Sequence, residues 1–192
     1  MRHSALLDRG QTVLVLIDLQ EGYRKALHAW ARVTAASALL LRGSDVLGIP
    51  ILVTEQYPQG VGSTAAEVRT LFPPGVALVE KRSMSCCGSD LFLEHLAVLR
   101  RRQILLAGIE THACVNQTVH DLLAAGYEVH VARDATSSRR PADVTPAWEK
   151  MQRAGMLPTS SEQALLELVR TADASDFKRL QQILKATVIP PD

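Results

Sequence analysis

The sequence predicts an α/β protein: a single three-layer α/β/α domain with a six-stranded, mostly parallel sheet. Six short apolar runs alternate along the chain with longer segments in which apolar residues recur every three or four positions. Strands and helices that alternate in this way form a sheet with right-handed crossovers and helices on both faces. The chain has 192 residues, of which 47% are hydrophobic, and this is enough for one full core. We therefore expect residues 1–192 to form one domain.

The six predicted strands are runs rich in leucine and β-branched residues. They lie at residues 12–19, 51–54, 76–79, 103–107, 127–132 and 157–159. Runs without alternating polar residues are typical of parallel strands that are covered on both faces. The run at 127–132 alternates more than the others, so we expect that strand to be less deeply buried.

The predicted helices fill the segments between and after these strands. They lie at residues 26–47, 65–71, 88–99, 113–125, 145–154, 160–169 and from 173 onward. Gly48 ends the first of them and Gly126 ends the fourth, because glycine readily leaves helical geometry. The segment Ser160-Ser161-Glu162-Gln163 has the form of a capping box, which marks the start of a helix.

Charge, hydropathy and cysteine content limit the partners and the compartment. The formal net charge is +1, so no excess of positive charge favours binding to a phosphate backbone. No apolar run is long enough to cross a bilayer, and the amino terminus lacks the apolar core of a signal peptide. Of three cysteines, Cys86 and Cys87 are adjacent, which suits reduced thiols better than a disulfide framework. We expect a cytoplasmic protein that binds neither nucleic acid nor membranes.

Two charged residues stand at the carboxyl ends of predicted strands. Asp18 ends the first strand, and Lys81 follows the third. In open α/β sheets this edge is where ligand crevices form, and a charge there is costly unless it is paired. Each residue also has a simpler interpretation. Asp18 is alternatively a turn-capping residue, and Lys81 a surface lysine.

A cysteine follows the fourth strand at the start of a helix. Residues 103–125 read as a strand, a tight turn at Gly108 and a helix with Cys114 in its first turn. The helix dipole there stabilises a thiolate and lowers its pKa, so Cys114 is a candidate nucleophile. Alternatively, Cys114 packs as a small buried hydrophobe. In a parallel sheet Asp18, Lys81 and Cys114 all lie at one edge, where a single crevice can hold them.

Loop residues beyond these strands are candidates for lining a substrate pocket. They are Gln20, Tyr23, Tyr57, Ser85 and His112, with Glu55 and Gln56 beside Tyr57. His112 is alternatively an exposed residue at a helix start. The six histidines are scattered without the spacing that a metal site needs.

Four motifs, in this order along the chain, carry a resemblance to a known family. They are Ile17-Asp18-Leu19-Gln20, then Lys81 with Ser83 and Ser85, then Gly108-Ile109-Glu110-Thr111-His112-Ala113-Cys114-Val115, and Asp134-Ala135 with Ser137-Ser138. With them the chain resembles the isochorismatase-like family of cysteine hydrolases, which includes nicotinamidases and N-carbamoylsarcosine amidases. The segments at 54–58, 108–110 and 176–178 resemble its isochorismatase domain-containing subgroup, whose physiological substrate is poorly defined.

The resemblance implies roles for specific residues. Asp18, Lys81 and Cys114 form a catalytic triad, and the peptide bond between Ile109 and Glu110 is cis. The backbone N–H groups of Glu110 and Cys114 form an oxyanion hole. The expected activity is cysteine-dependent hydrolysis of a small amide or carbamoyl C–N bond through a thioester, because isochorismatase itself cleaves a vinyl ether without a cysteine nucleophile.

The same resemblance informs the expectations about cofactors and partners. Family nicotinamidases carry an Asp-x-His metal motif with a second histidine, whereas residues 54–63 here contain neither histidine nor aspartate. We therefore expect no metal or other cofactor, and a small-molecule substrate. Apolar helix faces beyond what one sheet covers favour a homodimer or a higher homo-oligomer. Two alternatives to catalysis stay open: a binding or scaffold protein of the same fold, and a redox sensor that uses Cys114 with Cys86 or Cys87.

Overall fold

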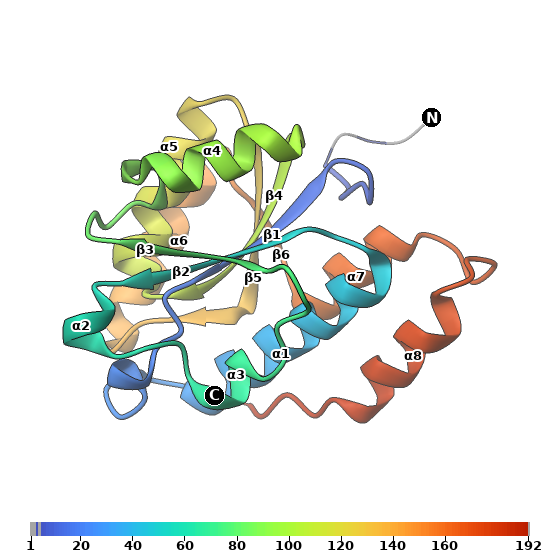
Figure 1. The fold of residues 1–192 in the computed structure, drawn as a ribbon, viewed down its shortest axis with the longest axis horizontal. Helices are drawn as coiled ribbons and strands as arrows, with labels where there is room; N and C mark the ends of the chain where they lie inside the picture. The colour runs from blue at the N-terminus through green and yellow to red at the C-terminus, as the bar shows by residue number, and fades with distance from the viewer. Residues whose placement is uncertain (1–2, 4, 192) are drawn as a thin grey trace.

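Six parallel strands form one sheet in the computed structural model, which describes residues 3 and 5–191 (Figure 1). The strands are β1 (Thr12–Ile17), β2 (Ile51–Gln56), β3 (Ala77–Lys81), β4 (Gln103–Ile109), β5 (Glu128–Ser137) and β6 (Leu157–Thr159). Their order across the sheet is β3-β2-β1-β4-β5-β6, and every pairing is parallel. The predicted fold class is confirmed, with a sheet that is entirely rather than mostly parallel.

Helices cover both faces of the sheet (Figure 1). They are α1 (Trp30–Leu47), α2 (Pro58–Val61), α3 (Ala66–Arg69), α4 (Asp90–Leu99), α5 (Asn116–Ala124), α6 (Val144–Arg153), α7 (Ser161–Val169) and α8 (Phe177–Ala186). One core packs α1, α3, α7 and α8 against the sheet, and a second core packs α4, α5 and α6 against its other face. These two cores make the three layers. No helix in the described part of the chain is long and apolar enough to cross a membrane.

Three elements differ from their predicted extents. The first helix begins at Trp30 rather than near residue 26, because Ala29 has a left-handed backbone with φ 59°. The helix after β4 is preceded by a π-helical turn at Thr111–Val115, so α5 itself starts at Asn116. The fifth strand continues to Ser137 rather than ending at residue 132, and it is less completely buried than β1, β2 and β4, as expected.

Gly108 lets the ends of β1 and β4 approach each other. Its φ is 113°, outside the range that L-residues readily adopt. A Cβ atom built there would lie 2.1 Å from the backbone oxygen of Ile17. A glycine is therefore needed just before the turn that carries Cys114, beside the strand that ends at Asp18.

We predict that Gly108→Ala lowers the free energy of unfolding by about 3 kcal/mol, because strain at positive φ is added to a backbone clash. Gly126→Ala is a matched control, since Gly126 also has a positive φ (86°) but a Cβ there would meet nothing within 4 Å. That control should lose only about 1 kcal/mol. Urea unfolding of both variants measures the difference, and equal losses would show that the contact with Ile17 is unimportant.

Candidate active site

Asp18 and Lys81 form a buried ion pair at the carboxyl ends of the strands. Asp18 directly follows β1, and Lys81 is the last residue of β3. The Lys81 Nζ atom lies 2.6 Å from Oδ2 of Asp18, and their side chains are 0% and 1% exposed. Because β2 separates β1 from β3 in the sheet, the long lysine side chain spans one strand to reach the carboxylate.

The Lys81 ammonium group is surrounded by further acceptors. Besides Asp18, it donates to Oε1 of Gln56 at 2.7 Å and to the backbone oxygens of Ser83 and Met84 at 3.2 Å each. Burial alone would lower the pKa of Lys81, but the charge of Asp18 and the hydrogen bond to it outweigh burial and raise that pKa. Lys81 therefore stays charged and acts as an electrostatic anchor.

The Asp18 carboxylate is held from two strands. Its Oδ1 atom accepts a hydrogen bond from the Thr54 hydroxyl at 2.7 Å, and its backbone N–H donates to the Thr54 carbonyl at 3.1 Å. Burial raises the pKa of Asp18, and the opposing contributions of Lys81 and Thr54 offset only part of this effect. A carboxylate with a raised pKa accepts a proton more readily than an exposed one, which suits a general base.

The Cys114 thiol completes this cluster. Cys114 is 4% exposed and lies in the π-helical turn at Thr111–Val115, where it interacts electrostatically with both Asp18 and Lys81. Burial and the negative charge of Asp18 raise the pKa of Cys114 to about 12, against the opposing effect of Lys81. The lowered pKa expected for a cysteine at a helix start is therefore wrong, because burial and the charge of Asp18 raise it. The resting sulfur is a thiol that needs a proton acceptor, and Asp18 is beside it.

A second ion pair holds the turn between β4 and Cys114. The peptide bond between Ile109 and Glu110 is cis. The Glu110 carboxylate accepts from Nη2 of Arg139 at 2.6 Å and from its Nε and backbone N–H at 2.9 Å each. Burial would raise the pKa of Glu110, but the Arg139 contacts outweigh it and lower that pKa. The sequence did not indicate this partner, because Arg139 comes from the loop after β5.

Of the predicted pocket residues, Tyr23 lies close enough to Asp18 and Cys114 to interact with their charges. It is half-buried, and burial together with the charges of Cys114 and Asp18 raises its pKa to about 12. His112 is partly exposed, and its Nδ1 atom lies 2.9 Å from Oγ of Ser138. Both residues are thus on the turns that surround Cys114.

The other predicted pocket residues have different positions. Gln20 is fully buried, and its side-chain amide binds the backbone of Gln56 and Gly62, so it holds the loop after β2 in place. Ser85 accepts a hydrogen bond from the Cys87 N–H and caps a short turn. Tyr57 is 41% exposed and packs on the Arg82 guanidinium at the β3 edge. Side-chain directions in loops depend on remote contacts, and the sequence pattern does not reveal them.

Thr54 contacts Asp18 and Cys86 contacts Thr54, and neither residue was predicted to line the pocket. Thr54 is in β2, which lies between the strands that lead to Asp18 and Lys81. The Cys86 thiol is fully buried and lies 3.8 Å from the Thr54 hydroxyl. Thr54 is the first polar residue after the apolar run Ile51–Val53 in β2, and this change near the carboxyl end of the strand is the signal that would have identified it.

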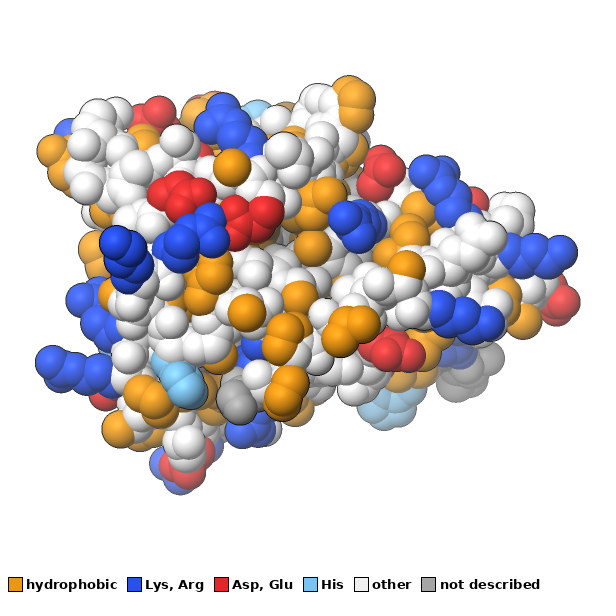
Figure 2. All heavy atoms as spheres, turned by 90° about the horizontal axis from the view of Figure 1, so that it is seen from below, with side chains coloured by type: hydrophobic (Ala, Val, Ile, Leu, Met, Phe, Trp, Pro, Cys, Tyr) orange, Lys and Arg blue, Asp and Glu red, His pale blue; other side chains and the backbone are white. Residues whose placement is uncertain are grey.

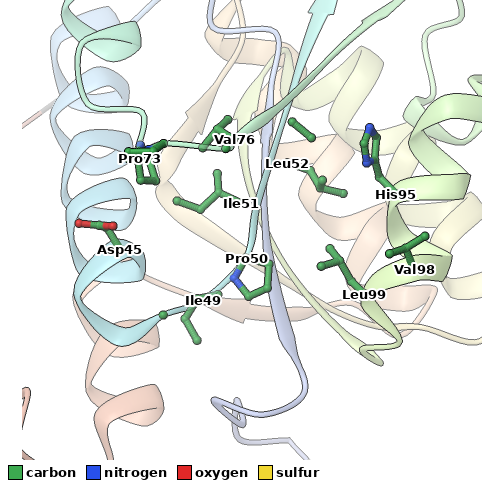
Figure 3. A pocket seen from close by; sticks show the side chains of 14 residues that line it. Asp45, Ile49, Pro50, Ile51, Leu52, Pro73, Val76, His95, Val98 and Leu99 are labelled. Atoms are coloured by element: carbon green, nitrogen blue, oxygen red, sulfur yellow. The ribbon is translucent and has the colours of Figure 1, made fainter.

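A separate hollow lies at the opposite ends of β2 and β3 (Figure 3). Its volume is about 360 Å³, and its lining is mainly apolar, with Asp45 and His95 as its ionisable groups. None of the predicted site residues lines it. Within residues 3 and 5–191, no group of three or more His, Cys, Asp or Glu side chains is placed to hold a metal ion.

Comparisons with known proteins identify the family. The model of the isochorismatase domain matches residues 12–163. Isochorismatase domain-containing protein 1 of Salmo salar is 39% identical over 181 residues, which cover 92% of this chain and 62% of that protein. Isochorismatase domain-containing protein 2 of Xenopus laevis is 35% identical over 184 residues, which cover 96% of this chain and 88% of that protein. The chain thus spans less than two thirds of the length of the salmon relative.

A solved structure has nearly the same fold. The MAR1 ribonuclease of Caenorhabditis elegans is 33% identical, with a TM-score of 0.92, and the match covers 97% of this chain and 95% of that one. The family model and these relatives each cover most of the described sheet and all three residues of the Asp18–Lys81–Cys114 cluster. The chain belongs to the isochorismatase family and has the hydrolase fold of that family.

Proposed function

We propose that this chain is a cysteine-dependent hydrolase that cleaves the C–N bond of a small amide or carbamoyl compound through a thioester. The observation that carries the proposal is the buried Asp18–Lys81 ion pair with the Cys114 thiol beside it. A thiol, a base and a fixed positive charge are the groups that nucleophilic acyl transfer needs. Membership of a hydrolase family supports the same reaction class.

In the first step the Cys114 sulfur attacks the carbonyl carbon of the substrate. Because the pKa of the thiol is about 12, its proton passes to Asp18 as the carbon–sulfur bond forms. Lys81 keeps its charge and holds the other oxygen of Asp18. The carbonyl oxygen becomes an oxyanion, and we assign the backbone N–H groups of Glu110 and Cys114 as its donors.

The intermediate then collapses to a thioester. The C–N bond breaks, and the nitrogen leaves with the proton that Asp18 received. In the second step Asp18 accepts a proton from water as the water oxygen attacks the thioester carbon. The acid is released, and the sulfur regains a proton from Asp18. No cofactor takes part in this sequence of steps.

The surroundings of Cys114 favour a small substrate. Cys114 is 4% exposed, and the nearby Tyr23 interacts with the charges of Glu110 and Arg139, which are paired with each other. The three free cysteines support the cytoplasm as the compartment. The two alternatives, a binding protein and a redox sensor, predict thiol labelling without amide turnover.

Hydrolysis of RNA is a second candidate, because a structure that is 33% identical is named a ribonuclease. The formal net charge of +1 gives little electrostatic support for binding a polyanion. A fluorescent single-stranded RNA incubated with the protein and with a Cys114→Ala variant distinguishes the candidates. Cleavage that depends on Cys114 would favour RNA over small amides.

Self-association is also part of the proposal. Leu91, Leu93 and Val98 on α4 are 48%, 38% and 80% exposed. The face shown in Figure 2, on the opposite side of the molecule, carries hydrophobic side chains interspersed with charged ones. Contact between copies through α4 would cover its apolar residues.

We predict that Cys114→Ala lowers turnover of a reactive small amide by about 10³-fold or more, because no nucleophile remains. Cys87→Ser is the matched control, since Cys87 is another free and partly exposed thiol. It should leave turnover unchanged. The measurement is a screen of primary amides and carbamoyl compounds, with mass spectrometry for an acyl group on Cys114. Turnover that survives in Cys114→Ala would contradict the proposal.

Asp18→Asn should separate thiol reactivity from turnover. The charge of Asp18 helps to raise the pKa of Cys114, so its removal leaves Lys81 beside the sulfur and lowers that pKa below about 12. In Asp18→Asn the thiol should therefore ionise, and be labelled as a thiolate by iodoacetamide, at pH values below the wild-type thiol pKa of about 12. Turnover should fall by about 10³-fold, because the nitrogen loses its proton donor. If turnover persisted, Asp18 would not be the base.

Light scattering after gel filtration tests self-association. We expect a mass of at least twice the 21.0 kDa of one chain. Val98→Asp should shift the mass toward that of one chain, because it places a charge on the proposed contact. A monomeric wild-type protein would contradict this part of the proposal.

A further inference from the structure

Thr54 lies between the two charged members of the triad and holds one of them. Its hydroxyl donates to Oδ1 of Asp18 at 2.7 Å, while Lys81 donates to Oδ2 at 2.6 Å. The two oxygens of the carboxylate are therefore each bound by a donor from a different strand, β2 and β3. This arrangement fixes the rotation of the carboxylate beside Cys114.

Cys86 binds the other side of the Thr54 hydroxyl. A hydroxyl group has one hydrogen to donate and lone pairs that accept. The short contact to Asp18 takes the hydrogen, so the Cys86 thiol at 3.8 Å is placed to donate to the Thr54 oxygen. The backbone N–H of Cys86 donates to the hydroxyl of Thr118 at 2.9 Å. Thr118 is buried in α5, one turn beyond Cys114, so Cys86 is anchored to the helix that follows the nucleophile.

We infer that Thr54 is a positioning residue that keeps the Asp18 carboxylate oriented and ionised as the proton acceptor for Cys114, and that the Cys86 thiol fixes the direction of the Thr54 hydroxyl. The inference rests on the proposed function, in which Asp18 takes the Cys114 proton. It gives a role to the Thr54 hydroxyl and the Cys86 thiol, two buried groups that take no part in the three-residue mechanism.

The direction of the effect follows from the hydrogen bond. A donor to a carboxylate stabilises the ionised form, so the Thr54 bond lowers the pKa of Asp18, against the raising effect of burial. The other ionisable groups that influence Asp18, or are influenced by it, are Lys81, Cys114, Cys86 and Tyr23. Loss of the Thr54 bond should raise the pKa of Asp18 further. Asp18 would then be protonated, and unable to act as a base, up to a higher pH.

The test is the pH dependence of Cys114 alkylation by iodoacetamide, followed at that residue by mass spectrometry. The wild-type rate should fall at low pH as Asp18 is protonated, and in Asp18→Asn this acid limb should be replaced by one that follows the ionisation of the Cys114 thiol itself. In Thr54→Val the limb should move to higher pH by about one unit, because one hydrogen bond to the carboxylate is lost. Thr54→Ser should restore the wild-type profile. Cys86→Ala should shift the limb in the same direction by less, and Cys86→Ser should not shift it.

Thr12→Val is the matched control for loss of a buried threonine hydroxyl. Thr12 is fully buried at the amino end of β1, and its hydroxyl bonds to Asp8 and Gln103, at the opposite end of the sheet. This variant should keep the wild-type limb even if it loses stability. If Thr54→Val failed to fold, Thr54→Ser and the two Cys86 variants would still give the result.

Several outcomes would overturn the inference. An unchanged limb in Thr54→Val, or a wild-type profile without an acid limb, would show that Thr54 does not set the acidity of Asp18. Alkylation needs no amide turnover, so this test is separate from the proposed function. A shifted limb in a protein that turns over no amide would support the role of Thr54 while contradicting the hydrolase.

Discussion

The ion pair between Asp18 and Lys81 is the interaction on which the rest of the site depends. Two charges removed from water are costly, and their attraction compensates only when the remaining donors and acceptors are also bound. Here Gln56 and two backbone oxygens bind the ammonium, and Thr54 binds the free carboxylate oxygen. The strand order explains the arrangement, because β2 lies between the strands that lead to the two charges and supplies both Gln56 and Thr54.

The same burial shifts the pKa values of the three side chains and so determines which of them carries a proton. Burial raises the pKa of both Asp18 and Cys114, while the charge of Asp18 raises that of Lys81. The favoured state has a charged pair and a neutral thiol, with an acceptor next to the thiol. In the proposed mechanism the proton of the sulfur passes to this carboxylate. The fixed positive charge beside both groups limits the free-energy cost of that transfer.

Much of the fold was predictable from the sequence, because apolar periodicity reports burial directly. Each of the six strands lies close to its predicted position, and the residues at the carboxyl ends of β1 and β3 form the charged pair. Gly108 also marked the turn before Cys114. The pKa of Cys114 was not predictable in this way, because the helix dipole is a local property whereas desolvation depends on segments that are remote in the sequence.

The pocket residues were the least predictable part. Gln20, Tyr57 and Ser85 follow strands as binding residues often do, yet Gln20 and Ser85 bind backbone groups and Tyr57 packs on Arg82. Glu110 and Arg139 come from different loops, and no spacing in the sequence connects them. A loop position indicates which edge of the sheet a residue occupies, but its neighbours decide where the side chain points.

The lysine of the pair stands on β3, which has a single partner in the sheet, β2. Outer strands of a sheet open in local fluctuations that need far less free energy than global unfolding. When β3 detaches, the carboxylate is left in the interior without its counter-charge. The Asp18–Lys81 pair should therefore separate at a lower free-energy cost than unfolding of the whole sheet. Amide hydrogens of β3 should accordingly exchange with solvent before those of β1 and β4, whose detachment would require the sheet itself to come apart.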